Sequence, residues 1–243
     1  MDLWRMGLGD RDRTSKASLF DALVVAGKAL SNGKGLELLD LLAQGERSVG
    51  SLARAARLGL TTASAHLRTL KQAGLVTTRR QGTRVFYRPA GDDVAALYEM
   101  LQQVAQGYLA AAGKARAACL GPEDTGQIPR EELLDHVKSG TATVIDVHPA
   151  GEYAGAYPRR SLHPLDQLEA RLAELPAGAE VAAYCRGTNC ALSHEAVRFL
   201  STQGRAARRL ADGMLEWRRA ELPVEPGAPA DPLTAAIPGP GQA

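Results

Sequence analysis

The sequence predicts two domains: a mainly α helix-turn-helix domain with a β wing, followed by an α/β domain with a parallel sheet. The chain has 243 residues, enough for two small hydrophobic cores. Residues 1–119 contain 17 Lys and Arg against 10 Asp and Glu, whereas residues 120–243 contain 12 against 17. A basic half joined to an acidic half favours contact of the first half with a polyanion, the alternative being uneven surface charge alone.

Apolar residues at helical spacing predict five helices in the basic half. Residues 1–16 are polar and are expected to form a flexible arm before a helix at 17–30. A leucine-rich helix follows and ends near residue 44, and Ser48 is an N-cap for the third helix. The fourth helix is expected at 62–73, capped by Thr61 or Thr62, and the last is expected at 92–119.

The third and fourth helices flank the tight turn Leu58–Leu60, which is typical of a helix-turn-helix. Two β-prone runs, 75–80 and 84–88, then surround Gly82 and carry several arginines. Such a pattern predicts a basic hairpin, or wing.

The order of helices, helix-turn-helix, basic wing and long last helix resembles the ArsR/SmtB family of winged-helix repressors. The segments Ala65–Val76 and Arg79–Tyr87 carry the resemblance, within domain limits of 17–119. It implies a homodimer formed by the first and last helices, with each recognition helix in a major groove of a double-stranded DNA operator. The candidate DNA contacts are Thr61, Thr62, Ser64, His66 and Arg68 on the recognition helix and Arg79, Arg80 and Arg84 on the wing.

Metal ligands of the kind that sense metals in this family are missing from the expected positions. The segment 47–53 contains no cysteine, and the last helix offers Asp92, Asp93 and Glu99 but no histidine. A thiolate or imidazole site of the usual composition cannot form there, so we expect neither a metal nor a cofactor.

Residues 120–127 are predicted to be a linker, because they are rich in helix breakers and polar residues. Strands are expected at 143–147 and 181–184, with helices at 164–175 and after residue 191. Alternating strands and helices indicate a parallel sheet with its site at the carboxyl ends of the strands. Residues 227–243 are rich in Pro, Gly and Ala and are expected to be disordered.

Cys185 lies at the end of a predicted strand, in a short loop that opens a helix. Backbone N–H groups and the positive end of the helix dipole favour its thiolate, and Arg186 adds positive charge. The alternative is a buried structural cysteine. Cys190, in the same loop, is either a small buried residue or a thiol that converts an oxidised Cys185 into a disulfide.

The loop, with Asp146–Val147, Glu152–Tyr153 and the segment 212–217, resembles a single-domain rhodanese spanning 128–226. The resemblance implies that Cys185 carries a persulfide in a backbone cradle and that Arg186 holds an anionic sulfur donor. The absence of arginine at 190 or 191 disfavours phosphatase or arsenate-reductase chemistry. The candidate site residues are Cys185, Arg186, Gly187, Thr188, Asn189, Cys190 and Asp146.

Three functions are consistent with these features. The first is a regulator, expected to be a repressor, that senses or carries sulfane sulfur on Cys185. The second is an active thiosulfate or polysulfide sulfurtransferase whose DNA-binding half autoregulates its operon. The third is a regulator with an inert rhodanese fold, since His148 and the segment 155–160 depart from the family pattern.

The sequence also bears on the cellular location of the protein. No apolar run approaches the ~18 residues of a membrane span, and the first five residues contain no signal-peptide core. Three cysteines argue against an extracellular disulfide scaffold. We therefore expect a cytoplasmic protein without membrane contact.

Overall fold

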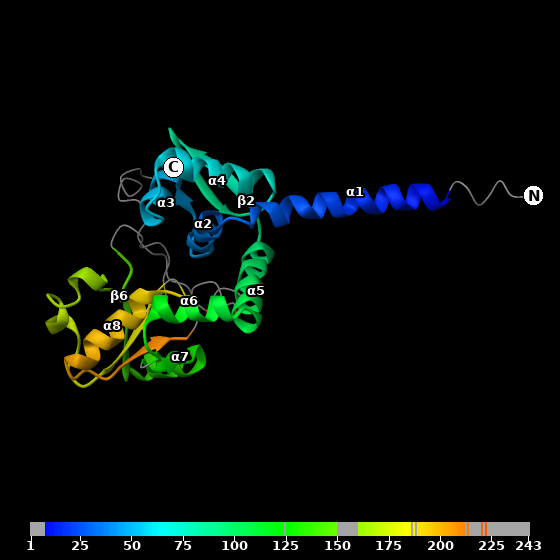
Figure 1. The fold of residues 1–243 in the computed structure, drawn as a ribbon. Coiled ribbons are helices and arrows are strands. Elements are labelled where there is room, and N and C mark those ends of the chain that lie inside the picture. The colour runs from blue at the N-terminus through cyan, green and yellow to red at the C-terminus, as the bar shows by residue number, and fades with distance from the viewer. Residues whose placement is uncertain are drawn as a thin grey trace, which may run out of the picture.

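The structure is a computed structural model that describes residues 8–123, 125–149, 160–185, 187, 189–211, 213, 220 and 222. It contains a helical N-terminal domain with a small antiparallel sheet and a C-terminal domain with a parallel sheet (Figure 1). The N-terminal half consists of α1 (Leu8–Ala29), α2 (Gly33–Ala43), β1 (Arg47–Ser48), α3 (Val49–Ala55), α4 (Leu60–Gln72), β2 (Val76–Gln81), β3 (Arg84–Pro89), α5 (Asp92–Tyr108) and α6 (Ala110–Leu120).

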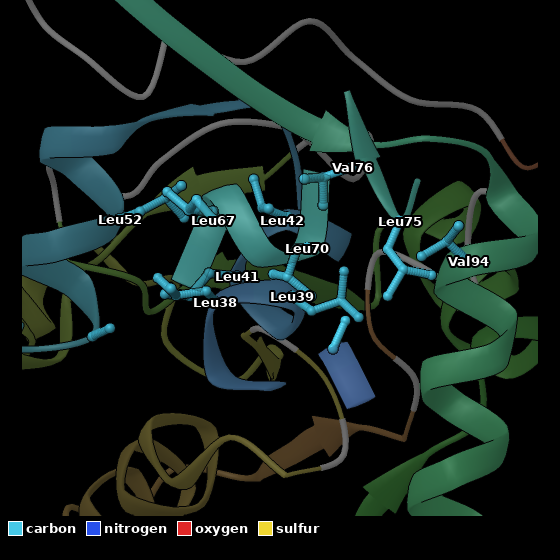
Figure 2. Packing of buried hydrophobic residues seen from close by; sticks show 12 residues of the cluster. Leu38, Leu39, Leu41, Leu42, Leu52, Leu67, Leu70, Leu75, Val76 and Val94 are labelled. Carbon is cyan, nitrogen blue, oxygen red and sulfur yellow. The ribbon is translucent and has the colours of Figure 1, made fainter. Parts of the chain in front are cut away.

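The core of the first domain forms where α2, α3 and α4 meet (Figure 2). Leucines of α2 at i, i+3 and i+4 spacing pack against Leu67 and Leu70 of α4, and Leu75, Val76 and Val94 close the cluster. The Ser48 side chain accepts a hydrogen bond from the N–H of Ser51, so the predicted N-cap is confirmed. β3 lies between β1 and β2, and the β2–β3 pair is the expected wing.

The beginnings of α1 and α4 differ from the expected ones. α1 begins at Leu8, so residues 8–16 of the expected arm are helical. Apolar periodicity could not reveal this, because a solvated helix needs no apolar face and each added residue gains a backbone hydrogen bond. α4 begins at Leu60 with Gly59 as its N-cap, so Thr61 and Thr62 lie inside the first turn and do not cap it.

The expected last helix is two helices. Leu109 has φ −108° and ψ 106°, an extended conformation that separates α5 from α6. Figure 1 shows α6 turning away from α5, and α6 packs against α8 of the second domain. Arg198 of α8 donates hydrogen bonds to the carbonyls of Leu120 and Pro122, each at 2.7 Å, and so fixes the end of α6.

The second domain is built around a parallel sheet in the order β4-β8-β7-β5-β6. Successive residues of the central strands point to opposite faces. Ile145, Val181 and Ala183 pack on one face, and Val144 and Ala182 pack on the other. Burial on both faces explains the continuous apolar runs. The elements are β4 (Gln127–Ile128), α7 (Arg130–Ser139), β5 (Ala142–Asp146), β6 (Arg160–Leu162), η2 (Leu165–Gln167), η3 (Leu172–Glu174), β7 (Glu180–Tyr184), α8 (Ala191–Thr202) and β8 (Ala207–Leu210).

The helix expected at 164–175 is wrong, because the chain forms only the short 3-10 helices η2 and η3 there. The Arg205 guanidinium donates hydrogen bonds to the carbonyls of Leu172, Leu175 and Pro176 at 3.4, 3.3 and 2.8 Å. Because a side chain satisfies these carbonyls, they do not need the backbone hydrogen bonds of a continuous α-helix. Leu168 and Leu175 are nevertheless buried.

Candidate functional sites: a DNA-binding face and a thiol loop

The recognition helix α4 has one buried side and one open side. Ala63, Leu67 and Leu70 hold it against the core, and all three have no exposed surface. Thr61, Thr62 and Arg68 are exposed on the open side, whereas Ser64 and His66 are half-buried. The predicted DNA contacts on α4 therefore lie outside its buried side.

The wing arginines differ in their surroundings. Arg79 donates from Nε to both carboxylate oxygens of Glu46, at 2.9 and 2.7 Å, and its guanidinium carbon lies 4.6 Å from the centre of the Phe86 ring. Arg79 thus braces the hairpin against the domain. Arg80 is exposed and Arg84 is half-buried, close to the turn at Gly82.

The second candidate site is the loop between β7 and α8. β7 places Cys185 at its carboxyl end, and Cys190 is the N-cap residue of α8. The two cysteines are joined as a disulfide, with their Cα atoms 6.2 Å apart. Cys185 is 2% exposed and Cys190 is 7% exposed. The predicted site residues Arg186 and Thr188 lie outside the described residues.

Local contacts set the shape of the loop. The N–H of Cys190 donates to the carbonyl of Gly187 at 3.0 Å, and the Ser193 hydroxyl donates to the carbonyl of Cys190 at 3.1 Å. Gly187 has φ +134°, which an L side chain rarely adopts, and a Cβ at this position would meet the Cα of Gly213 at 3.6 Å. The Cys190 amide is used within the loop, so it contributes to the turn and not to a free anion cradle.

A buried polar cluster lies directly under the loop. Asp146 accepts hydrogen bonds from Tyr184, the residue before Cys185, at 2.8 Å, and from His148 Nδ1 at 2.6 Å. Burial raises the pKa of the Asp146 carboxyl, but hydrogen bonds and charge from His148 and the Tyr184 hydroxyl outweigh burial, so the net pKa is lowered. Because Asp146 is occupied by these contacts, its geometry suits a positioning role better than contact with sulfur.

The side chain of Asn189 contacts the first domain. Its side-chain oxygen accepts from Gln106 Nε2 at 3.3 Å and from Arg116 Nε at 3.1 Å, and its Nδ2 donates to Gln102 Oε1. The thiol loop is therefore connected directly to α5 and α6. Sequence reasoning missed these partners, since they are uncharged or common surface residues more than 70 positions away in the chain.

A cleft of about 1010 Å³ opens beside these contacts, between the loop and the first domain. Asp40, Tyr98, Arg116, Asn189 and Cys190 are among the residues that line it. The exposed thiol of Cys119 lies in the same cleft. A small molecule entering the cleft would meet both domains at once.

The described part of the chain contains no group of three His, Cys, Asp or Glu residues that could hold a metal ion. No helix within it combines the length and apolarity needed to cross a bilayer.

The family model for bacterial regulatory proteins of the arsR family matches residues 34–78, and the rhodanese-like domain model matches residues 129–220. The HTH-type transcriptional regulator Rv0324 of Mycobacterium tuberculosis is 50% identical over 223 residues, which cover 91% of this chain and 97% of that protein. The chain belongs to the ArsR family. It is an ArsR-family DNA-binding regulator that carries a rhodanese-like C-terminal domain.

Two further relatives match only part of this regulator. The transcriptional activator HlyU of Vibrio cholerae is 37% identical over 81 residues, 33% of this chain and 75% of that protein. The solution structure of a homodimeric winged helix-turn-helix DNA-binding domain from Mycobacterium bovis is 54% identical and covers 40% of this chain and 89% of its own, with a TM-score of 0.38.

Proposed function

We propose that this ArsR-family regulator is a homodimeric repressor in the cytoplasm, and that the thiol state of Cys185 and Cys190 sets its affinity for an operator. A sulfane-sulfur donor such as a polysulfide is the proposed signal. The observation that carries the proposal is the position of the loop 185–190. It contains both cysteines of the disulfide, and its Asn189 contacts α5 of the DNA-binding domain.

The homodimer is supported by an exposed apolar surface on α1 and α5. Large apolar side chains recur there at helical spacing, and a monomer rarely exposes so many together. A second copy of the chain would cover them and would present two recognition helices to a two-fold operator. The exposed residues are Leu19, Phe20, Leu23, Val24 and Val25 on α1 and Leu97, Met100, Leu101, Val104 and Tyr108 on α5.

The proposed chemistry needs only the two thiols and the donor. The Cys185 thiolate attacks the sulfane sulfur, the donor's S–S bond breaks, and the donor leaves as a thiolate, which gives a Cys185 persulfide. The Cys190 thiolate then attacks Cys185 Sγ and releases hydrosulfide, which leaves the Cys185–Cys190 disulfide. The two thiols lose two electrons, which reduce the sulfane sulfur to sulfide. The N-terminus of α8 stabilises the reacting thiolate.

The test measures DNA binding and thiol state in the same samples. The full chain, reduced and polysulfide-treated, is titrated with a duplex selected from a random-sequence pool by the wild-type protein, and intact mass is recorded. We expect disulfide formation and a change in affinity for the wild type but neither for Cys185→Ser. Cys119→Ser is the control, because its thiol lies outside the loop and should leave the response unchanged. An unchanged response in Cys185→Ser would exclude the sensor.

The cleft supports a second candidate function, steady-state sulfur transfer from Cys185 to an acceptor. An opening of about 1010 Å³ beside Cys190 has room for a small thiol or cyanide. Thiocyanate formation from thiosulfate and cyanide separates the two functions, because a sensor needs one turnover and an enzyme continues to turn over.

A further inference from the structure

The connection between the thiol loop and the first domain does not end at α5. Gln102, which accepts from Asn189, lies one turn after Tyr98 on α5, and Gln102, Tyr98 and Asp40 of α2 line the same cleft. Four side chains thus form a continuous polar chain from the residue beside Cys190 to α2.

Tyr98 is the central residue of this chain. Burial, together with the charge and hydrogen bond of Asp40, raises the pKa of Tyr98 well above its usual range, whereas the bond to Gln102 lowers it. The Tyr98 hydroxyl therefore stays protonated, with Asp40 and Gln102 beside it in the cleft. Gln102 lies between the two domains, because its oxygen accepts from Asn189 and its side chain lines the cleft together with Tyr98.

The far end of this chain belongs to the core that holds the recognition helix. Asp40 lies on α2 between Leu39 and Leu41, which are 1% exposed and share a cluster with Leu67 and Leu70 of α4 (Figure 2). Close-packed interiors transmit small displacements instead of absorbing them. A shift of α2 would therefore move α4 with it.

We propose that Asn189 is the positioning residue that couples the thiol state of the 185–190 loop to the DNA-binding domain, through Gln102, Tyr98 and Asp40. This inference rests on the proposed sensing function and supplies its route. In the disulfide form, the bond to Cys185 fixes Cys190, and with it the neighbouring Asn189, against α5 and α6. Reduction removes that constraint, and Asn189 leaves Gln102.

The experiment compares operator affinity between the reduced and disulfide forms of the full chain, using the duplex selected by the wild-type protein. The variants are Asn189→Ala and Gln102→Ala, alone and together. Gln103→Ala is the matched control, because Gln103 lines the same cleft on the same helix and bonds to Glu99 instead. Intact mass verifies that both loop thiols are joined in each oxidised sample.

Coupling between sites in proteins is typically about 5- to 150-fold in affinity, and we expect the wild-type ratio between the two forms to fall in that range. In Asn189→Ala and in Gln102→Ala the ratio should approach one, with no further loss in the double variant, while Gln103→Ala keeps the wild-type ratio. A merely structural role would change the affinities of both forms equally and leave their ratio intact.

Retention of the wild-type ratio by Asn189→Ala would overturn this route and leave thiol sensing standing. A wild-type ratio of one would overturn sensing itself, and the route with it. The two failures are therefore distinguished by the wild-type measurement alone.

Discussion

Truncation of a single leucine on the exposed face of α1 should dissociate the proposed dimer. Leu23 is 59% exposed. Full burial of a leucine is worth about 1.5–3 kcal/mol, so covering the remaining surface is worth about 1–1.8 kcal/mol in each copy. Because a two-fold interface contains each residue twice, Leu23 contributes about 2–3.5 kcal/mol to the free energy of dimerisation. At about 1.4 kcal/mol for each tenfold change, Leu23→Ala should raise the dimer dissociation constant about 30- to 300-fold.

Sedimentation equilibrium of the full chain without DNA measures this constant. Leu60→Ala is the matched control, because Leu60 is 60% exposed but belongs to the recognition helix and not to α1 or α5. The control should keep the wild-type constant. Equal shifts in the two variants, or no shift in Leu23→Ala, would refute the assignment of this face to the dimer.

Three further predictions concern binding, stability and pH. Arg80→Ala should reduce the slope of log affinity against log salt concentration by about 0.9 if Arg80 contacts one phosphate, as measured by DNA titrations across salt concentrations. Arg79→Ala should lower the stability measured by urea unfolding more than it lowers this slope, because the Arg79 guanidinium pairs with Glu46. Leu67→Ala should destabilise the first domain by about 2–5 kcal/mol in urea unfolding, because Leu67 is fully buried. Asp146→Asn should destabilise the second domain at neutral pH, because the folded pKa of Asp146 is lowered. The stability that the carboxylate contributes is present above its unfolded pKa of 3.8 and is lost as the pH falls through the folded pKa. Urea unfolding across that pH range should show the difference in stability between variant and wild type shrinking.

Local patterns in the sequence predict most elements that carry the two sites. The leucine spacing of α2 and the buried positions 63, 67 and 70 of α4 reflect a single apolar face, which a short window reveals. The strand that delivers Cys185 and the helix that follows are likewise encoded within about twenty residues. The position of the cysteine loop could therefore be predicted from sequence alone.

Long-range polar contacts could not be predicted in this way. Asn189 and Gln102 are 87 residues apart, and neither residue type marks a site by itself. The break at Leu109 has no proline to announce it, and the leucine spacing of 164–175 fits successive short turns as well as a helix, once Arg205 supplies the missing hydrogen bonds. In each case tertiary contacts, which a linear pattern does not contain, decide the conformation.

The break at Leu109 also changes where one module ends and the next begins. The composition places the boundary at 120–127, yet α6 lies against α8, and Arg198 holds its last carbonyl. A protein cut within that stretch would strip a helix from the sheet domain and expose the side of α8 that it covers. We therefore expect a sheet-domain fragment that begins at Ala110 to be more stable than one that begins within 120–127. The link between α5 and α6 then consists of a single extended residue, immediately after the helix that Asn189 contacts.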